Sequence, residues 1–234
     1  MSTTSQHISK QFDNELEDVR TKVLSMGGVV EQQLTNALRA LVENDIAKAE
    51  LVIDKELMVN TQEVNIDQEC TQILARRQPA AGDLRLVMAI IKTITDLERV
   101  GDEAQKIAKF AIKLAEKQGP KSYYVGINAM GNLVVKMIHD ALDAFARMDS
   151  QAALNVAEKE PESDEQYSVI LRQLITYMME DPRNISSSID AVLTARALER
   201  VGDHARNICE NVIYLVEGVD VRHISLEEIE KEIS

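Results

Sequence analysis

The chain has 234 residues, a formal net charge of −13 and few aromatic residues, 3% of the total with no tryptophan. The negative charge argues against direct binding to nucleic acid or to acidic lipid surfaces, and the aliphatic composition favours close-packed helices over a β-sandwich. No apolar run approaches the roughly 18 residues that span a bilayer, and the first residues lack a signal peptide's apolar segment, so we expect a cytoplasmic protein.

Turn-forming residues divide the chain into six predicted helices. Pro, Gly, Asn and Asp interrupt the apolar periodicity at five places, and Asp45 and Asp149 are suited to cap the helices that follow them. Pro161 is expected to kink or restart the fifth helix. The predicted breaks are Asn44–Asp45, Gln78–Gly82, Gly119–Pro120, Met148–Asp149 and Asp181–Pro182, and the predicted helices are 8–44, 46–76, 83–117, 122–147, 150–180 and 187–217.

The second half of the chain repeats the first. A shift of 104 positions places Met26-Gly27 on Met130-Gly131, and the same shift places Lys55-Glu56 on Lys159-Glu160. Such identities, held in one register, indicate a tandem duplication. We therefore predict an all-α fold of two pseudo-symmetric three-helix bundles. The predicted units are residues 8–118, residues 121–218 and a polar C-terminal tail, residues 219–234.

The most faithfully repeated segment is polar. Leu97-Glu98-Arg99-Val100-Gly101-Asp102 returns as Leu198-Glu199-Arg200-Val201-Gly202-Asp203. In each copy the glutamate and the aspartate are one helical turn apart, so their carboxylates share a face. The glycine lies on the apolar seam, where the missing side chain lets a neighbouring helix approach.

The preceding helix of each half carries acidic residues that face this motif. Glu56 and Glu160 interrupt the apolar stripe at the same step, and Asn60 and Asp164 follow one turn later. Counted back from the turns, these positions are level with the acidic motif to within about one turn in an antiparallel pair. Oxygen donors therefore converge once in each half: Glu56, Asn60, Glu98 and Asp102 in the first, and Glu160, Asp164, Glu199 and Asp203 in the second.

Buried carboxylates need a cation, a proton or an arginine, and the spacing leaves two interpretations open. In one, the donors bind a hard or borderline divalent cation such as Mg²⁺, Mn²⁺ or iron. In the other, the repeated Arg99 and Arg200 neutralise them, with Lys106 as a further partner in the first half only. The Glu-x-x-His pattern of ferritin-like iron sites is missing, so His139 and His204 are expected to be surface residues.

Two further residues have a simple structural interpretation. Cys70 and Cys209 lie inside helical patterns without metal-type spacing. We expect both thiols to be reduced and buried.

Taken together, the motifs resemble those of the PhoU family of bacterial phosphate-signalling regulators over nearly the whole chain. The resemblance rests on His7-Ile8-Ser9 with Phe12, Met26-Gly27-Gly28, Ala75-Arg76-Arg77-Gln78-Pro79, Asp83-Leu84-Arg85 and the two Glu-Arg-Val-Gly-Asp motifs.

The resemblance implies two similar three-helix bundles and metal clusters at the acidic motifs. The candidate ions are Mg²⁺, Mn²⁺, iron and Zn²⁺. It also implies an adaptor, without catalytic activity, that links the ATPase subunit of the high-affinity phosphate ABC transporter to the phosphate-sensing histidine kinase. Such an adaptor would repress the phosphate-starvation response, limit uptake and reach the inner membrane only through its partners. We expect a homodimer. The alternative is a metal-dependent phosphatase or oxidase built on the carboxylate clusters.

Overall fold

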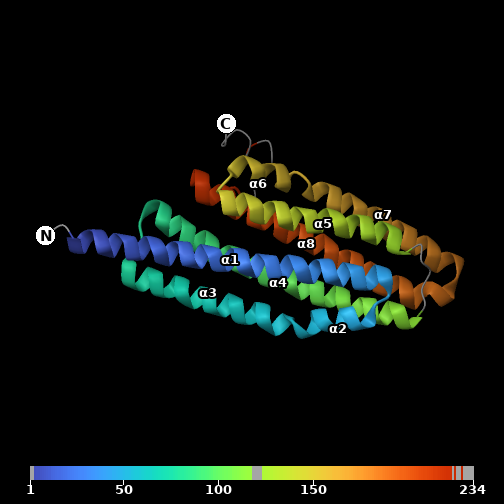
Figure 1. Ribbon diagram of the computed structural model, residues 1–234. Helices are drawn as coiled ribbons and strands as arrows, with labels where there is room; N and C mark the ends of the chain where they lie inside the picture. Colours follow the sequence, from blue (N-terminus) through green and yellow to red (C-terminus); the bar gives the residue numbers. More distant parts are fainter. Residues whose placement is uncertain (1–2, 118–122, 223, 225–227, 229–234) are drawn as a thin grey trace.

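The computed structural model describes residues 3–117, 123–222, 224 and 228, and this part of the chain is helical with no strand (Figure 1). The predicted break at Gly119–Pro120 and most of the tail 219–234 lie outside these residues. The elements are α1 (Thr3–Glu43), α2 (Ile46–Asp54), α3 (Glu56–Arg77), α4 (Ala81–Lys117), α5 (Tyr123–Arg147), α6 (Ser150–Ala157), α7 (Glu160–Glu180), the 3₁₀ turn η1 (Pro182–Asn184) and α8 (Ile185–Glu217).

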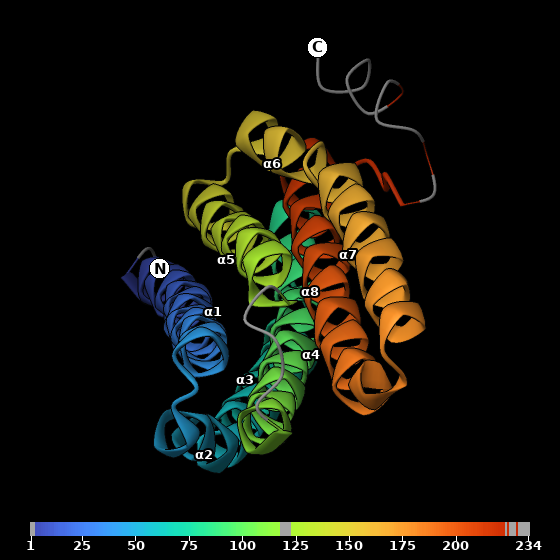
Figure 2. The ribbon, with the colours of Figure 1, turned by 90° about the vertical axis from the view of Figure 1, so that its right-hand side faces the viewer.

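The helices form two antiparallel bundles, as the sequence predicts. Helices α1 to α4 make the first bundle and α5 to α8 the second, and the two pack through α4 against α8 and α1 against α5. Figure 2 shows α4 and α8 side by side between the outer helices of both halves. The buried residues of both bundles form one continuous hydrophobic core. None of the described helices combines the length and the low charge that crossing a bilayer requires.

The second and the fifth predicted helices are each divided in two. The fifth restarts at Glu160, next to Pro161 in the first turn of α7, which confirms the expected interruption. The second is interrupted at Lys55, between α2 and α3, although no proline is present there. Because both halves break at the same place, the interruption belongs to the repeated fold. It places Glu56 and Glu160 in the first turn of a helix, where the helix dipole favours a carboxylate.

The predicted helix caps are confirmed in both halves. The side chain of Asp45 accepts a hydrogen bond of 2.9 Å from the backbone N–H of Lys48, and Asp149 accepts one of 2.9 Å from Ala152. These bonds satisfy backbone donors that the first helical turn leaves unpaired. The residue before each cap, Asn44 or Met148, is left-handed, with a φ of 54° or 51°.

A reciprocal contact joins α1 to α5. A Cβ atom at Gly27 would lie 2.6 Å from the side chain of Leu142, and one at Gly131 would lie 2.5 Å from the side chain of Leu38. Gly27 and Gly131 are equivalent in the repeat, and so are the two leucines. The halves are therefore related by a pseudo-twofold arrangement in which each glycine admits the other half's leucine.

Candidate metal site

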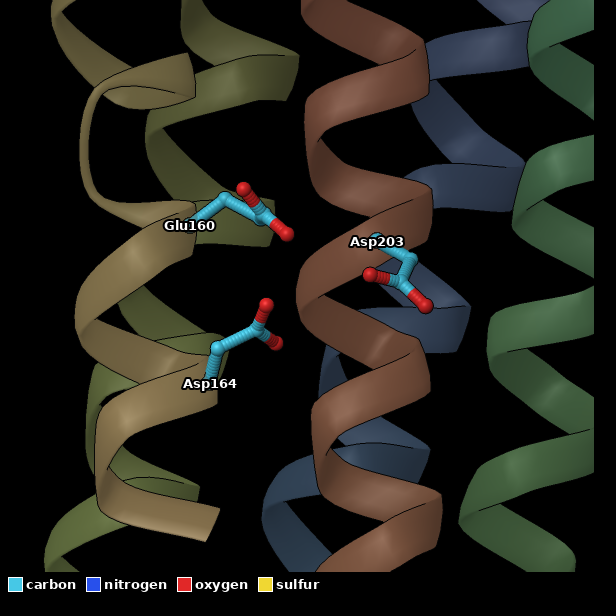
Figure 3. Close-up of side chains that lie close together, drawn as sticks. All are labelled: Glu160, Asp164 and Asp203. Atoms are coloured by element: carbon cyan, nitrogen blue, oxygen red, sulfur yellow. The ribbon is translucent and has the colours of Figure 1, made fainter. Parts of the chain in front are cut away.

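Three carboxylates of the second bundle converge between α7 and α8. Glu160 and Asp164 project from successive turns of α7 toward Asp203 on α8 (Figure 3). Each residue offers an oxygen, and these oxygens lie within 4.8 Å of one another. Glu160 and Asp203 are half-buried and Asp164 is exposed, so the group borders solvent on one side. A cation could therefore enter without disrupting the core.

Two buried polar groups beside this group have no hydrogen-bond partner among the described residues. One is Oε2 of Glu199, a buried residue one turn before Asp203, and the other is the hydroxyl of Ser163, next to Asp164. The Ser163 oxygen would lie 3.0 Å from a Cβ atom at Gly202, so the seam glycine gives it room. Unpartnered buried oxygens are costly. Glu199 also interacts electrostatically with Asp203, Asp164 and Glu160, so its free oxygen suits an additional cation ligand.

The environment makes the ionised form of this group unfavourable. The pKa values of Glu160, Glu199 and Asp203 are all raised, first by burial and then by the neighbouring carboxylates. These carboxylates carry more negative charge than the nearby basic side chains neutralise, and a bound divalent cation would offset the excess negative charge.

Arginines do approach the group, but they are not the predicted ones. Arg206 donates a 3.1 Å hydrogen bond to Glu160 and another of 3.1 Å to Glu210, and Arg196 pairs with Glu199. They lie three or four residues from their acidic partners on α8 and therefore share a helix face with them.

The predicted neutralising residues have other partners. Arg200 pairs with the buried Glu103 across the α4–α8 interface at 3.0 Å, and Lys106 pairs with the same carboxylate at 2.9 Å. Arg99 forms no ion pair with a described residue, although its charge lowers the pKa of Glu98 and so opposes burial and the carboxylates that raise it. The charge of Arg200 likewise lowers the pKa of Asp203. The expectation that Arg99 and Arg200 neutralise the clusters through ion pairs is therefore wrong for the described residues, since both act on the clusters only through their charge.

In the first bundle the equivalent residues are also close, but the set has one carboxylate fewer. The pKa of Glu56 is raised by burial and then by Asp102, and the pKa of Glu98 is raised by burial and then by the same aspartate. Asn60 stands where the second bundle has Asp164. Among the described residues, only the second bundle brings three acidic oxygens within a common distance suited to one ion.

Sequence reasoning missed Glu63 as a member of the first cluster. The pKa of Glu63 is raised by burial and then by Asp67 and more weakly by Asp102, and Glu63 in turn raises the pKa of Glu98. Glu63 lies in the buried stripe of α3, two turns after Glu56, and this position could have identified it as a member of the cluster.

The predictions for the histidines and cysteines have mixed outcomes. His139 is exposed, as predicted, and lies 3.2 Å from Glu31. The prediction for His204 is wrong, since it is buried between α8 and α4 with Nδ1 3.0 Å from Asp96. It follows Asp203 directly, so it points about 100° away from the carboxylates, into the interface of the halves.

Cys70 and Cys209 are free and buried, as predicted, and burial raises the pKa of both thiols.

Comparison with known proteins gives one family. The family model for the PhoU domain matches residues 23–111 and 127–212. The phosphate-specific transport system accessory protein PhoU homolog of Pseudomonas aeruginosa is 52% identical over 227 residues, 97% of this chain and 94% of that protein. The accessory protein PhoU of Escherichia coli (strain K12) is 47% identical over 228 residues, 97% of this chain and 94% of that protein.

Solved structures show the same similarity. The crystal structure of PhoU from Pseudomonas aeruginosa superposes with a TM-score of 0.87 at 51% identity, covering 89% of this chain and 100% of that one. PhoU from Streptococcus pneumoniae, described as a phosphate transport system regulatory protein, superposes with a TM-score of 0.83 at 33% identity, covering 90% of this chain and 99% of that one.

Proposed function

The chain belongs to the PhoU family of phosphate-specific transport system accessory proteins, and from this premise we propose that it is a cytoplasmic regulatory adaptor. It links the ATPase subunit of a phosphate ABC transporter to a phosphate-sensing histidine kinase, represses the phosphate-starvation response when phosphate is plentiful, and limits phosphate uptake. The supporting observation is the identity of about half of the residues to named accessory proteins along nearly the whole chain, in both halves. The proposed adaptor acts as a homodimer and reaches the inner membrane through its partners.

We further propose that the acidic clusters hold divalent cations. In the second bundle the ligands are Glu160, Asp164, Glu199 and Asp203, and the first bundle offers Glu56, Asn60, Glu98 and Asp102. Support comes from the converging oxygens, the raised pKa values and the unpartnered Oε2 of Glu199. Carboxylate-rich sets without sulfur suit Mg²⁺, Mn²⁺ or iron better than softer ions, and Zn²⁺ is a further candidate. The ion would offset the repulsion between α7 and α8 and hold these helices together.

The adaptor function is tested in a bacterial host that lacks its own member of the family. We expect this chain to repress a phosphate-starvation promoter in phosphate-rich medium, and the purified protein to bind the transporter's ATPase subunit and the histidine kinase. A promoter that stays fully active while the folded protein accumulates would contradict the proposal.

The rival function, a metal-dependent phosphatase or oxidase, makes a different prediction. It requires the Mn²⁺-loaded protein to hydrolyse p-nitrophenyl phosphate, or to consume oxygen with Fe²⁺, faster than the Asp164→Asn, Asp203→Asn variant does. As an adaptor, the parent should show no excess over that variant in either assay. A clear excess would favour the enzyme.

A further inference from the structure

A groove of about 560 Å³ lies between α1 and the α2–α3 segment of the first bundle. We call it the α1–α2 groove. It has the size of small-molecule sites in proteins. No acidic side chain of the described residues lines it, although the chain carries a net charge of −13. The lining residues that the argument uses are Gln33 and Asn36 of α1, Lys55 between α2 and α3, and the apolar Leu51, Val52 and Met58.

Gln33 of α1 lines this groove and carries a buried, unused amide. The residue is 3% exposed, and neither its Oε1 nor its Nε2 has a hydrogen-bond partner among the described residues. Its Oε1 would lie 3.6 Å from a Cβ atom at Gly101, so the amide extends inward from the groove toward α4. A buried amide without partners is costly, and a ligand that offers both an acceptor and a donor would satisfy it.

In the second bundle, the lysine equivalent to Lys55 is paired with a carboxylate of the same bundle. There Lys159, the equivalent of Lys55, donates a 3.1 Å hydrogen bond to Asp140, and Lys136 donates another of 3.1 Å to the same carboxylate. Asp140 is the equivalent of Asn36. The second bundle therefore fills the position with its own anion.

The first bundle replaces this anion with a neutral group. Asn36 accepts a 3.0 Å hydrogen bond from Gln32, the equivalent of Lys136. Lys55 forms no ion pair with a described residue. The unpartnered Gln33 is the equivalent of Met137, which is fully buried and apolar. Compared with the second bundle, the first bundle thus lacks an internal anion and has an unused amide in the same groove.

We propose that the α1–α2 groove binds a nucleoside phosphate. Lys55 holds the phosphate in the place that Asp140 takes in the second bundle, and the amide of Gln33 pairs with adjacent donor and acceptor atoms on the edge of the base. Glutamine amides make such paired hydrogen bonds to adenine. Leu51, Val52 and Met58 supply an apolar wall for the base. This site is separate from the acidic clusters and does not depend on the adaptor function.

Titration of the full chain with adenosine 5′-monophosphate (AMP) tests the proposal by calorimetry. We expect a dissociation constant below about 1 mM. Asn36→Asp, which rebuilds the anion of the second bundle, should weaken binding at least tenfold, and so should Lys55→Gln. Asn132→Asp and Lys113→Gln make the same charge changes on exposed parts of α5 and α4 and should leave binding within twofold. Circular dichroism checks that each variant is folded.

Two simpler probes separate the parts of the site. Inorganic phosphate and adenosine should each bind more weakly than AMP, and Gln33→Met should remove the preference for AMP over inorganic phosphate. AMP that binds no more tightly than inorganic phosphate would overturn the assignment of Gln33. No AMP binding up to about 10 mM, or equal binding by the parent and Asn36→Asp, would overturn the site itself.

Discussion

Asn60 and Asp164 occupy equivalent positions, and this single difference leaves the first acidic cluster with one carboxylate fewer than the second. An amide supplies one oxygen and no charge. We predict that Asn60→Asp increases the Mn²⁺ affinity of the first bundle at least tenfold, because it completes the carboxylate set. The test is calorimetry in a background that carries Asp164→Asn and Asp203→Asn. Unchanged Mn²⁺ binding after Asn60→Asp would show that the first cluster is not an ion site.

The raised carboxyl pKa values predict how stability changes with pH in the metal-free protein. Since Glu160, Glu199 and Asp203 resist ionisation in the folded state, their charges destabilise the fold at neutral pH. This cost decreases as the pH falls through their raised pKa values toward the ordinary carboxyl range.

Asp203→Asn should therefore stabilise the metal-free protein at pH 7, and the difference from the parent should shrink at lower pH. Urea unfolding with a chelator present, at a series of pH values, measures it. An advantage of the variant that grows as the pH falls would contradict the assigned cause.

At the scale of single residues, the sequence predicts which carboxylates meet but not which cations accompany them. Helical spacing puts Glu160 and Asp164 on one face, and the count back from the turn puts Asp203 of the antiparallel helix level with them. Arg200 and His204 directly follow Glu199 and Asp203, and neighbours in a helix point in different directions, so both turn toward α4. Arg196, three residues before Glu199, and Arg206, three residues after Asp203, share a helix face with the motif and were the better candidates.

At the scale of elements, the crossing of α1 and α5 depends on two glycines. Gly27→Ala should destabilise the protein by about 1–3 kcal/mol, because the new methyl group overlaps Leu142. Gly28→Ala is the matched control. Its Cβ would meet nothing within 4 Å, so the better helix propensity should stabilise the protein by about 0.5–1 kcal/mol.

A double-mutant cycle identifies the cause of this effect. Leu142→Ala removes the overlapping side chain, so Gly27→Ala should cost at least about 1 kcal/mol less in that background. Chemical denaturation measures all four proteins. An equal cost of Gly27→Ala in both backgrounds would rule out the contact with Leu142 as the cause.

The order of the helices, their caps and the interruption near Pro161 follow from local sequence signals. The interruption at Lys55 does not, since no residue there prevents a helix from continuing. The interruption can be predicted only by aligning the first half with the second half, in which Pro161 marks the equivalent break. The duplication therefore contains structural information that neither half shows alone.

At the scale of the whole molecule, the shared core makes the two bundles one cooperative unit. Leu198 is fully buried on α8, and Leu198→Ala should cost about 2–5 kcal/mol. We predict that it lowers the midpoint of a single thermal transition in the metal-free protein. Scanning calorimetry would contradict this prediction if the variant unfolded in two steps, with the first bundle melting as in the parent.

The pairing of the halves could not be derived from the repeat. Internal similarity predicts two bundles of one kind, but the side chains between α4 and α8 are polar as well as apolar. Glu103 with Arg200 and Asp96 with His204 are not equivalent pairs in the repeat. They are determined by the contact of the two halves, which no spacing within one half reveals.

Mn²⁺ titration of the metal-free protein shows whether the carboxylates between α7 and α8 form a cation site. The parent should bind Mn²⁺ stoichiometrically, and Asp164→Asn with Asp203→Asn should abolish the tightest site while the protein stays helical. Glu162→Gln with Glu165→Gln removes two exposed charges from the same helix and should leave that site intact. No Mn²⁺ binding by the parent, or equal binding by both double variants, would show that these carboxylates do not form a cation site.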